Sequence, residues 1–144
     1  MTGDGPRGLG IEVPGQRRDD ELEVLARRAV LLFEQSQNHA ALAIAWLALV
    51  SVESFNGRFE EQARAAEQAL KHTRLAWRRS STLCGLEGAL ILGPRRSDEA
   101  LEMLDSRAPE HPPPIMLIRR AELLMMLARV DESAQIAREA ADRL

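Results

Sequence analysis

One short pattern occurs twice in this chain, and a looser copy lies between. Residues 57–70 read GRFEEQARAAEQAL, and residues 128–140 read ARVDESAQIAREA. When Arg58 is placed on Arg129, the acidic residues and the alanines that follow them coincide as well. The looser copy, SDEALEMLD, covers residues 97–105. A unit of about 34 to 37 residues therefore occurs three times, and a period in this range is typical of stacked helical hairpins.

The composition favours helices for this repeat. Hydrophobic residues make up 45% of the chain, mainly Ala and Leu, with three Phe, two Trp and no Tyr. Ala and Leu form helices readily, whereas β-branched and aromatic residues suit strands. We therefore predict an all-α fold of about seven helices, made of three degenerate hairpins and a leading helix. Residues 1–18 are predicted to be a flexible Gly/Pro-rich leader, and residues 19–144 the repeat domain.

Apolar spacing and capping residues give the expected bounds of the helices. Asn38 is predicted to cap the second helix and Gly57 to end it, Ser97 to cap the fifth, and Pro114 to stand at the start of the sixth. The expected helices are Asp19 to about Gln37, His39–Phe55, Phe59 to about Thr73, about Leu75 to Leu92, Ser97 to about Arg107, Ile115–Ala128 and Asp131–Leu144.

Periodicity also predicts which faces of the helices are apolar. The leading helix carries one stripe at spacings of three and four, and the helix after Gly57 carries a row of small residues that would let its partner helix approach closely. Gly85 and Gly88 weaken the fourth helix, and we interpret both as sites of close backbone packing. The stripe consists of Leu22, Leu25, Ala29, Leu32 and Phe33, and the row of Ala63, Ala66, Ala69 and Leu70.

Charge and cysteine content exclude several classes of protein. The formal net charge is −3, so no strong overall field recruits nucleic acid or an anionic membrane. Cys84 is the single cysteine and cannot form an internal disulfide. The first residues are Gly-rich and polar, unlike a secretory signal, and the apolar stretch 40–52 is too short to span a bilayer. We expect a cytoplasmic protein, and the many Arg and Ala residues suggest a bacterial one.

No catalytic or metal-binding motif is recognisable. His39, His72 and His111 are spread over different expected elements, and a single cysteine leaves a poor set of metal ligands. The motifs GxxxxGK[ST], GxSxG and HExxH do not occur. We therefore predict no catalytic residue, no cofactor and no metal, and a protein that is not an enzyme.

Four basic residues fall near one face if the third and fourth helices run almost together. They are Lys71, Arg74, Arg78 and Arg79. One aromatic residue, Trp77, lies nearby to stack on a base. A solvated face with local partners, such as Glu67 with Lys71, explains these residues more simply. We do not expect a nucleic-acid partner.

With the hairpins placed, the chain resembles tetratricopeptide repeats, which stack pairs of antiparallel helices of about 34 residues. The resemblance implies a right-handed array. The matching positions are Trp46, Leu49, Gly57, Ala66 and Ala69 in the first copy and Gly88, Ala100 and Leu104 in the middle copy. The sequence departs from the usual pattern at Val50, Glu53, Gln62 and Ser133.

A narrower resemblance is to the C-terminal repeat region of large bacterial signalling ATPases, in which a nucleotide-binding module is joined to a cyclase or a LuxR-type DNA-binding domain. It covers about residues 20–144 and is carried most by Gly93, Pro94, Glu99 and Ala100 in LILGPRRSDEALEML. The sequence contains no P-loop, cyclase carboxylate pair or helix-turn-helix. The resemblance therefore implies a sensor or scaffold module in bacterial signalling or transcriptional regulation.

In such an array the first helix of each hairpin faces a shared concave groove. The strip predicted there is mostly apolar and suits an amphipathic helix or an extended peptide. It consists of Ile44, Leu47, Ser51, Thr82, Ala89, Ile118, Glu122 and Met125. The alternative for Ile118 and Met125 is that they belong to the core.

We therefore predict a scaffold or adaptor module that binds a protein or peptide partner. One alternative is an autoregulatory segment whose groove is filled by upstream domains of a parent chain. A second is a small-ligand sensor whose groove closes over an effector. The sequence predicts no membrane partner and leaves oligomerisation open.

Overall fold

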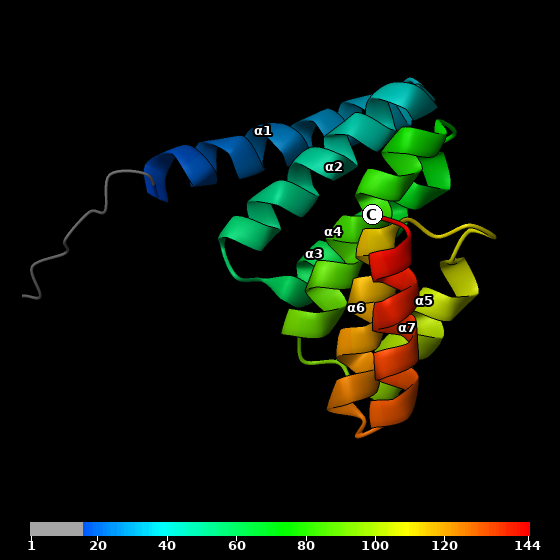
Figure 1. Cartoon of the computed structure of the whole chain (residues 1–144). Helices are drawn as coiled ribbons and strands as arrows, with labels where there is room; N and C mark the ends of the chain where they lie inside the picture. The colour runs from blue at the N-terminus through cyan, green and yellow to red at the C-terminus, as the bar shows by residue number, and fades with distance from the viewer. Residues whose placement is uncertain (1–15) are drawn as a thin grey trace, which may run out of the picture.

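The computed structural model describes residues 16–144, with side chains from Asp20 onward, and these residues form seven helices (Figure 1). The all-α fold predicted from the sequence is confirmed for this part of the chain. Of the leader predicted for residues 1–18, residues 1–15 lie outside the described residues, and residues 16–18 belong to the first helix. The helices are α1 (Gln16–Gln35), α2 (His39–Phe55), α3 (Phe59–His72), α4 (Ala76–Leu92), α5 (Ser97–Arg107), α6 (Pro114–Met126) and α7 (Val130–Asp142).

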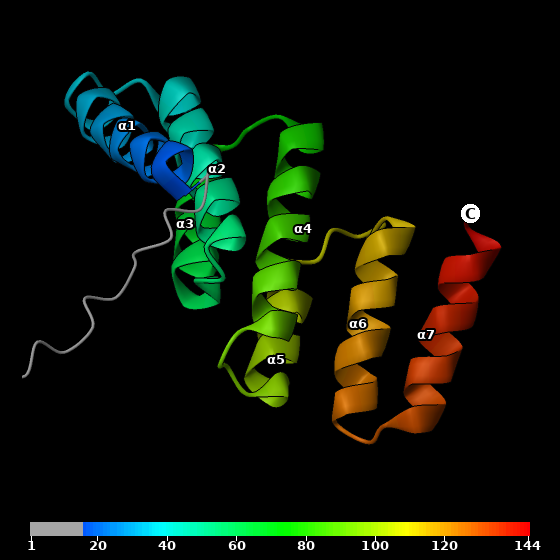
Figure 2. The same cartoon turned by 90° about the vertical axis from the view of Figure 1, so that its left-hand side faces the viewer.

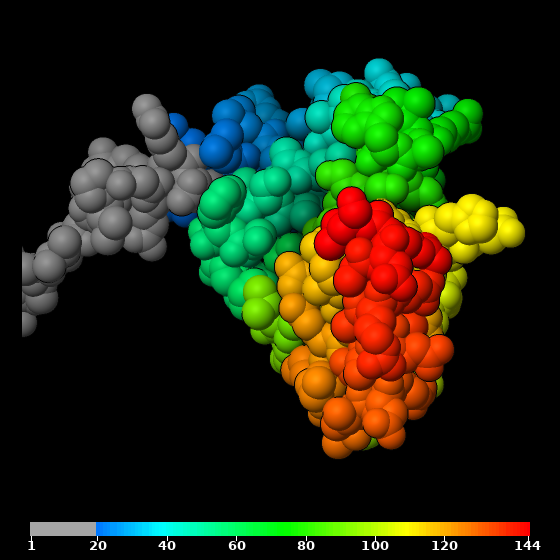
Figure 3. All heavy atoms as spheres, viewed as in Figure 1, coloured from blue at the N-terminus to red at the C-terminus, as the bar shows by residue number. Residues whose placement is uncertain are grey.

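The helices pack mainly against their neighbours in the chain, as expected for an array of hairpins. Pairs α2 and α3, and α6 and α7, lie side by side along their lengths, and α1 packs on α2. Helices α2, α4 and α6 follow one another across the molecule and contact each other in that order (Figure 2). The segment between α5 and α6 projects from the surface (Figure 3). None of the helices within residues 16–144 has the length and hydropathy needed to cross a bilayer.

Three turns between helices share one backbone geometry. Each contains a residue with positive φ, namely Gln37 (φ 52°), Gly57 (φ 68°) and Ala128 (φ 58°). In each turn the next residue donates its backbone N–H to a carbonyl five positions earlier in the preceding helix, at 2.9 to 3.1 Å. The correspondence of residues 57–70 with residues 128–140 in the sequence therefore extends to the hydrogen bonds of the turn.

Ala128→Gly is expected to raise the free energy of unfolding by about 0.5 to 1 kcal/mol, because glycine adopts this conformation without the Cβ strain that alanine has. Gly57→Ala should lower it by about 1 kcal/mol for the same reason. Urea unfolding measures both changes. Ala137→Gly, at an exposed position within α7, is the control and should be destabilising. If Ala128→Gly were as destabilising as the control, the left-handed turn would be wrong.

Small residues form much of the contact between α2 and α3. Ala63, Ala66 and Ala69 are fully buried, as their spacing predicted. An added Cβ at Gly85 would lie 2.9 Å from Cγ1 of Val50, so the close packing predicted there is confirmed. At Gly88 an added Cβ would meet nothing within 4 Å, so the same interpretation is wrong for that residue.

Two other local predictions differ from the structure. The stripe predicted on α1 is largely exposed at Leu22, Leu25 and Leu32, because α1 packs through Ala26 and Val30. Ser97 is not a capping residue: the capping position is Arg96, and no side chain caps α5 there. Asn38, in contrast, accepts the N–H of Ala41 as predicted for the cap of α2.

Two polar residues, in the second helix of the first and last hairpins, replace the alanine that is usual in tetratricopeptide repeats, and both have a structural role. Gln62 and Ser133 occupy equivalent positions of α3 and α7, and both are buried. The Gln62 amide donates to the Gly85 carbonyl of α4 at 2.9 Å, and the Ser133 hydroxyl donates to the Ala121 carbonyl of α6 at 2.8 Å. Gln62 thus joins α3 to α4, and Ser133 joins α7 to α6.

Candidate functional site

An open cleft of about 400 Å³ lies between α2 and α4, with α3 below it. The close approach of Val50 to Gly85 sets the spacing of these helices. Clefts of this size are within the usual range for binding sites. The lining residues are Leu47, Val50, Ser51, Ser54 and Phe55 from α2, Gln62 from α3, and Ser81 and Gly85 from α4.

Two of the residues predicted to line a groove lie in this cleft. They are Leu47, which is half-buried, and Ser51, which is exposed. Ile44 is also exposed on α2 but does not line the cleft.

The two residues predicted from α4 are core residues. Thr82 is 0% exposed and Ala89 is 2% exposed, so neither faces an open groove. The hydroxyl of Thr82 donates to the Arg78 carbonyl of its own helix. Ser81 and Gly85 are the α4 residues that line the cleft. The face of α4 that was predicted to line the groove is therefore in the core, and a different face of the helix lines the cleft.

The three residues predicted from α6 are on the surface but away from this cleft. Ile118 and Met125 are exposed, so they are not the core residues considered as the alternative. Glu122 is half-buried and pairs with Arg119 at 2.9 Å. The structure therefore does not bring these residues together with Leu47 and Ser51 in one cleft.

The cleft combines an exposed aromatic ring with a buried hydrogen-bond acceptor. Phe55 is 83% exposed, although it is the last residue of a helix whose other side is in the core. The Oε1 atom of Gln62 is buried and has no hydrogen-bond partner among the described residues. An unsatisfied buried acceptor is costly to the stability of the fold. This acceptor could not be predicted from the sequence, because Gln62 is buried only by the packing of three helices.

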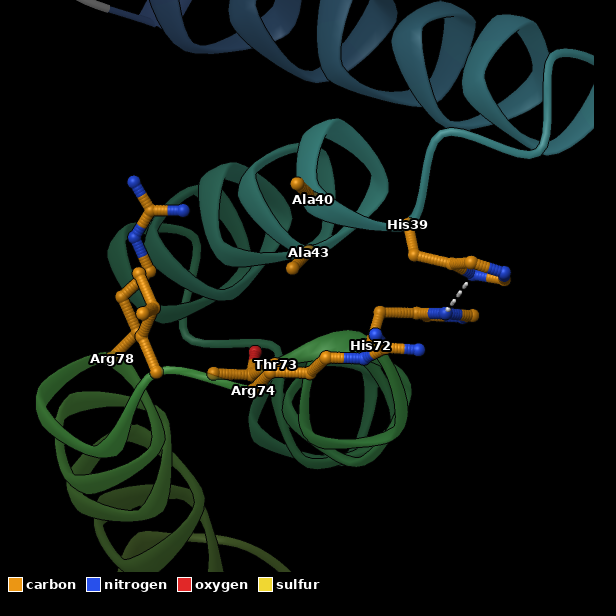
Figure 4. Close-up of a pocket in the computed structure, with 8 residues that line it drawn as sticks. His39, Ala40, Ala43, His72, Thr73, Arg74 and Arg78 are labelled. Atoms are coloured by element: carbon orange, nitrogen blue, oxygen red, sulfur yellow. Dashed lines mark hydrogen bonds between the residues drawn. The ribbon is translucent and has the colours of Figure 1, made fainter.

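A second cavity, of about 200 Å³, lies where α2 begins, α3 ends and α4 begins. His39 and His72 form one side of it, with their rings stacked and their Nδ1 atoms 3.1 Å apart (Figure 4). Arg78 lies on the opposite side, beyond Ala40 and Ala43 (Figure 4). In the sequence, these histidines lie on different expected elements. An antiparallel hairpin, however, places the start of its first helix beside the end of its second.

A third, small cavity of about 30 Å³ lies among α4, α5 and α6 beside Glu87. Glu87 is 0% exposed, and neither carboxylate oxygen has a hydrogen-bond partner among the described residues. Burial raises the pKa of Glu87 to about 7, and the positive charge of Arg119 acts against that rise. The cavity has room for about one or two water molecules, so it is not a ligand site.

Among the described residues, no group of three or more His, Cys, Asp or Glu side chains is arranged to hold a metal ion. The protein-family models, the curated proteins and the solved structures that were compared with this chain contain no match to it.

Proposed function

We propose that the chain is a protein-interaction module that binds a peptide segment of a partner in the cleft between α2 and α4. The cleft itself carries the proposal, because it contains Leu47 and Ser51 at positions that the hairpin register selects for a binding groove. The resemblance to tetratricopeptide repeats, which implies a right-handed array, supports the same class of function. The resemblance to repeat regions of bacterial signalling ATPases suggests a role in signalling or transcriptional regulation.

The chemistry of the cleft suits a peptide. Exposed Phe55 and half-buried Leu47 offer apolar surface to a side chain, and aromatic residues are common anchors in interfaces. Ser51, Ser54 and Ser81 line the cleft, and their hydroxyl groups suit the backbone of an extended segment. An open cleft leaves one side of an occupant in water, whereas most small-molecule sites enclose their ligand. This difference favours a peptide over an effector that must be enclosed.

We expect peptides selected from a displayed random library against the whole chain to lose at least about tenfold in affinity when Ser51→Glu and Phe55→Ala are combined. The first change places a charge in the cleft, and the second removes the exposed aromatic ring. Fluorescence anisotropy with labelled peptides measures the dissociation constants. Circular dichroism verifies that the variant keeps its helices.

Ile118→Glu with Met125→Glu is the matched control on α6. If only this pair weakens binding, the peptide site lies on α6 and the cleft is not the site. If no peptide is selected but a set of small metabolites raises the melting temperature, the sensor alternative replaces the proposal. If other domains of a parent chain compete with the peptides for the cleft, the autoregulatory alternative describes its natural occupant.

A further inference from the structure

The cavity between the start of α2 and the junction of α3 with α4 gathers basic side chains from three helices. It is bordered by His39 on α2, His72 on α3, Arg78 on α4, and Arg74 in the junction. Lys71 lies next to His72, and within the described part of the chain its ammonium group bonds only to the side chain of Gln68, at 3.2 Å. No carboxylate residue lines this cavity.

The two arginines of the cavity lack ion pairs, unlike most arginines whose side chains the structure describes. Neither Arg74 nor Arg78 lies within ion-pair distance of a carboxylate among the described residues. Glu67, the expected local partner of Lys71, instead pairs with Arg107 at 3.3 Å. The guanidinium of Arg78 lies over the ring of Trp77, 5.1 Å from its centroid, so its charge has an aromatic neighbour but, in the described part of the chain, no carboxylate to balance it. Free arginines beside a cavity are suited to binding an anion.

The start of α2 adds a backbone donor to the same cavity. Ala40 and Ala43 line it, and their small side chains leave the first turn of the helix accessible. The N–H of Ala41 is taken by the side chain of Asn38, while the N–H of Ala40 has no hydrogen-bond partner among the described residues. A helix N-terminus also favours negative charge through its dipole.

The geometry points to a site for the terminal phosphate of a small phosphate ester, held by Arg74, Arg78 and the histidine pair at the start of α2. A phosphate dianion has several acceptor oxygens, which match donors that approach from several sides. A cavity of about 200 Å³ has room for the phosphate and part of the group that it is attached to. This site lies outside the cleft proposed for the peptide, and the inference does not depend on that proposal.

A metal ion is a poorer candidate for the same cavity. The Nδ1 atoms of His39 and His72 are close enough to share an ion, but their rings are stacked, with an angle of 14° between the ring planes. In this orientation the nitrogen lone pairs, which lie in the ring planes, do not converge on one point. The free charges of Arg74 and Arg78 would also repel a cation.

Anion binding at this site should be coupled to proton uptake. Burial, and then the positive charges of His39 and Lys71, lower the pKa of His72, whereas Glu34 acts in the opposite direction. Arg78 adds a further positive charge from α4 across the cavity. A bound anion would stabilise protonated His72 and raise its pKa, so affinity should fall as the pH rises through that pKa.

Sulfate is the first probe, because it remains a dianion from pH 6 to pH 8 and any pH dependence then belongs to the protein. Nuclear magnetic resonance of the imidazole groups follows the titration. We expect the signals of His39 and His72 to shift, and the dissociation constant to be at least about threefold higher at pH 8 than at pH 6. Arg74→Ala with Arg78→Ala should weaken binding at least about tenfold.

Arg28→Ala with Arg138→Ala is the control, since both arginines are exposed and also lack ion pairs among the described residues. This pair should leave the titration unchanged. Ribose 5-phosphate should bind more tightly than sulfate. Equal losses in the two double variants, or no histidine shift at millimolar sulfate, would overturn the site. Binding of a short oligothymidylate without any response to sulfate or ribose 5-phosphate would overturn the ligand class in favour of nucleic acid.

Discussion

Replacing both Arg27 and Arg58 by methionine is expected to lower the free energy of unfolding by about 3 kcal/mol and the melting temperature by roughly 10 °C. The reason is Glu53, whose side chain is buried on α2 and bonds to both arginines. Arg27 donates to Oε1 of Glu53 at 2.8 Å from α1, and Arg58 donates to Oε2 from the turn before α3. A buried carboxylate that loses its partners is strongly destabilising.

A second carboxylate increases this effect. Glu23 on α1 also accepts hydrogen bonds from Arg27 and Arg58. Both bonds lower the pKa of Glu23, and the bond from Arg58 has the larger effect. Without the arginines, Glu23 and Glu53 would face each other as two negative charges. The four residues therefore join α1 to the first hairpin through charges that compensate each other.

Rescue by a third substitution separates this explanation from a general loss of packing. Adding Glu53→Met to the double variant removes the isolated charge, and we expect most of the lost stability to return, because buried ion pairs can often be replaced by apolar residues of similar size. Arg28→Met with Arg138→Met is the control for loss of arginine. Guanidinium unfolding measures all four proteins. The explanation fails if the triple variant is no more stable than the double variant.

The positions of the helices could be predicted from the sequence because their signals are local. Helix α2 runs from His39 to Phe55 as expected, since Asn38 supplies the cap and Gly57 the left-handed turn. Ala128 has the same backbone geometry as Gly57, although alanine is not a typical signal for it. The repeat in the sequence, more than the residue type, identifies that turn.

The faces of the helices were harder to predict. One residue corresponds to a rotation of about 100° around a helix, so choosing Thr82 in place of Ser81 exchanges a core position for a cleft position. On α1, the stripe with Leu25 and the stripe with Val30 are both apolar, and only contact with α2 decides that Val30 is the buried one. Such a choice depends on residues far away in the sequence.

The candidate sites depend even more on distant residues. His39 and His72 are 33 positions apart and meet only because α2 and α3 are antiparallel. Their separation is about one repeat unit, so the hairpin prediction contained the signal for this pair. No comparable signal marks Glu53 or Glu87, since the burial of a carboxylate follows from the helices packed around it.

Glu87→Gln is expected to remove the loss of stability that Glu87 causes as the pH rises from about 5 to about 8. Glu87 is buried without partners for its oxygens among the described residues, and burial raises its pKa from 4.5 to about 7. Between these values the folded protein binds more protons than the unfolded chain. Glu87 should therefore lower the free energy of unfolding by roughly 2 to 3 kcal/mol as the pH rises from about 5 to about 8, and the lowered pKa of His72 should offset part of this fall.

Glu87 and Glu23 should be distinguishable by pH because their pKa values shift in opposite directions. The lowered pKa of Glu23 gives stability that is present above pH 4.5 and is lost as the pH falls through its pKa in the folded protein. The raised pKa of Glu87 acts between pH 4.5 and about 7, where acidification increases stability. Above pH 5 the lowered pKa of His72 acts against Glu87, so the difference between Glu87→Gln and the unsubstituted protein is the quantity that reports on Glu87.

Urea unfolding at several pH values tests this expectation. The glutamine variant should be more stable than the unsubstituted protein at pH 8, and this advantage should shrink at pH 5, where Glu87 is protonated in the folded state. Glu102→Gln, at an exposed position on α5, is the matched control and should keep the original pH profile. If Glu87→Gln also keeps that profile, the pH dependence comes from another group. Loss of the profile would show that the array carries an unpaired buried carboxylate next to α6, which costs stability at neutral pH.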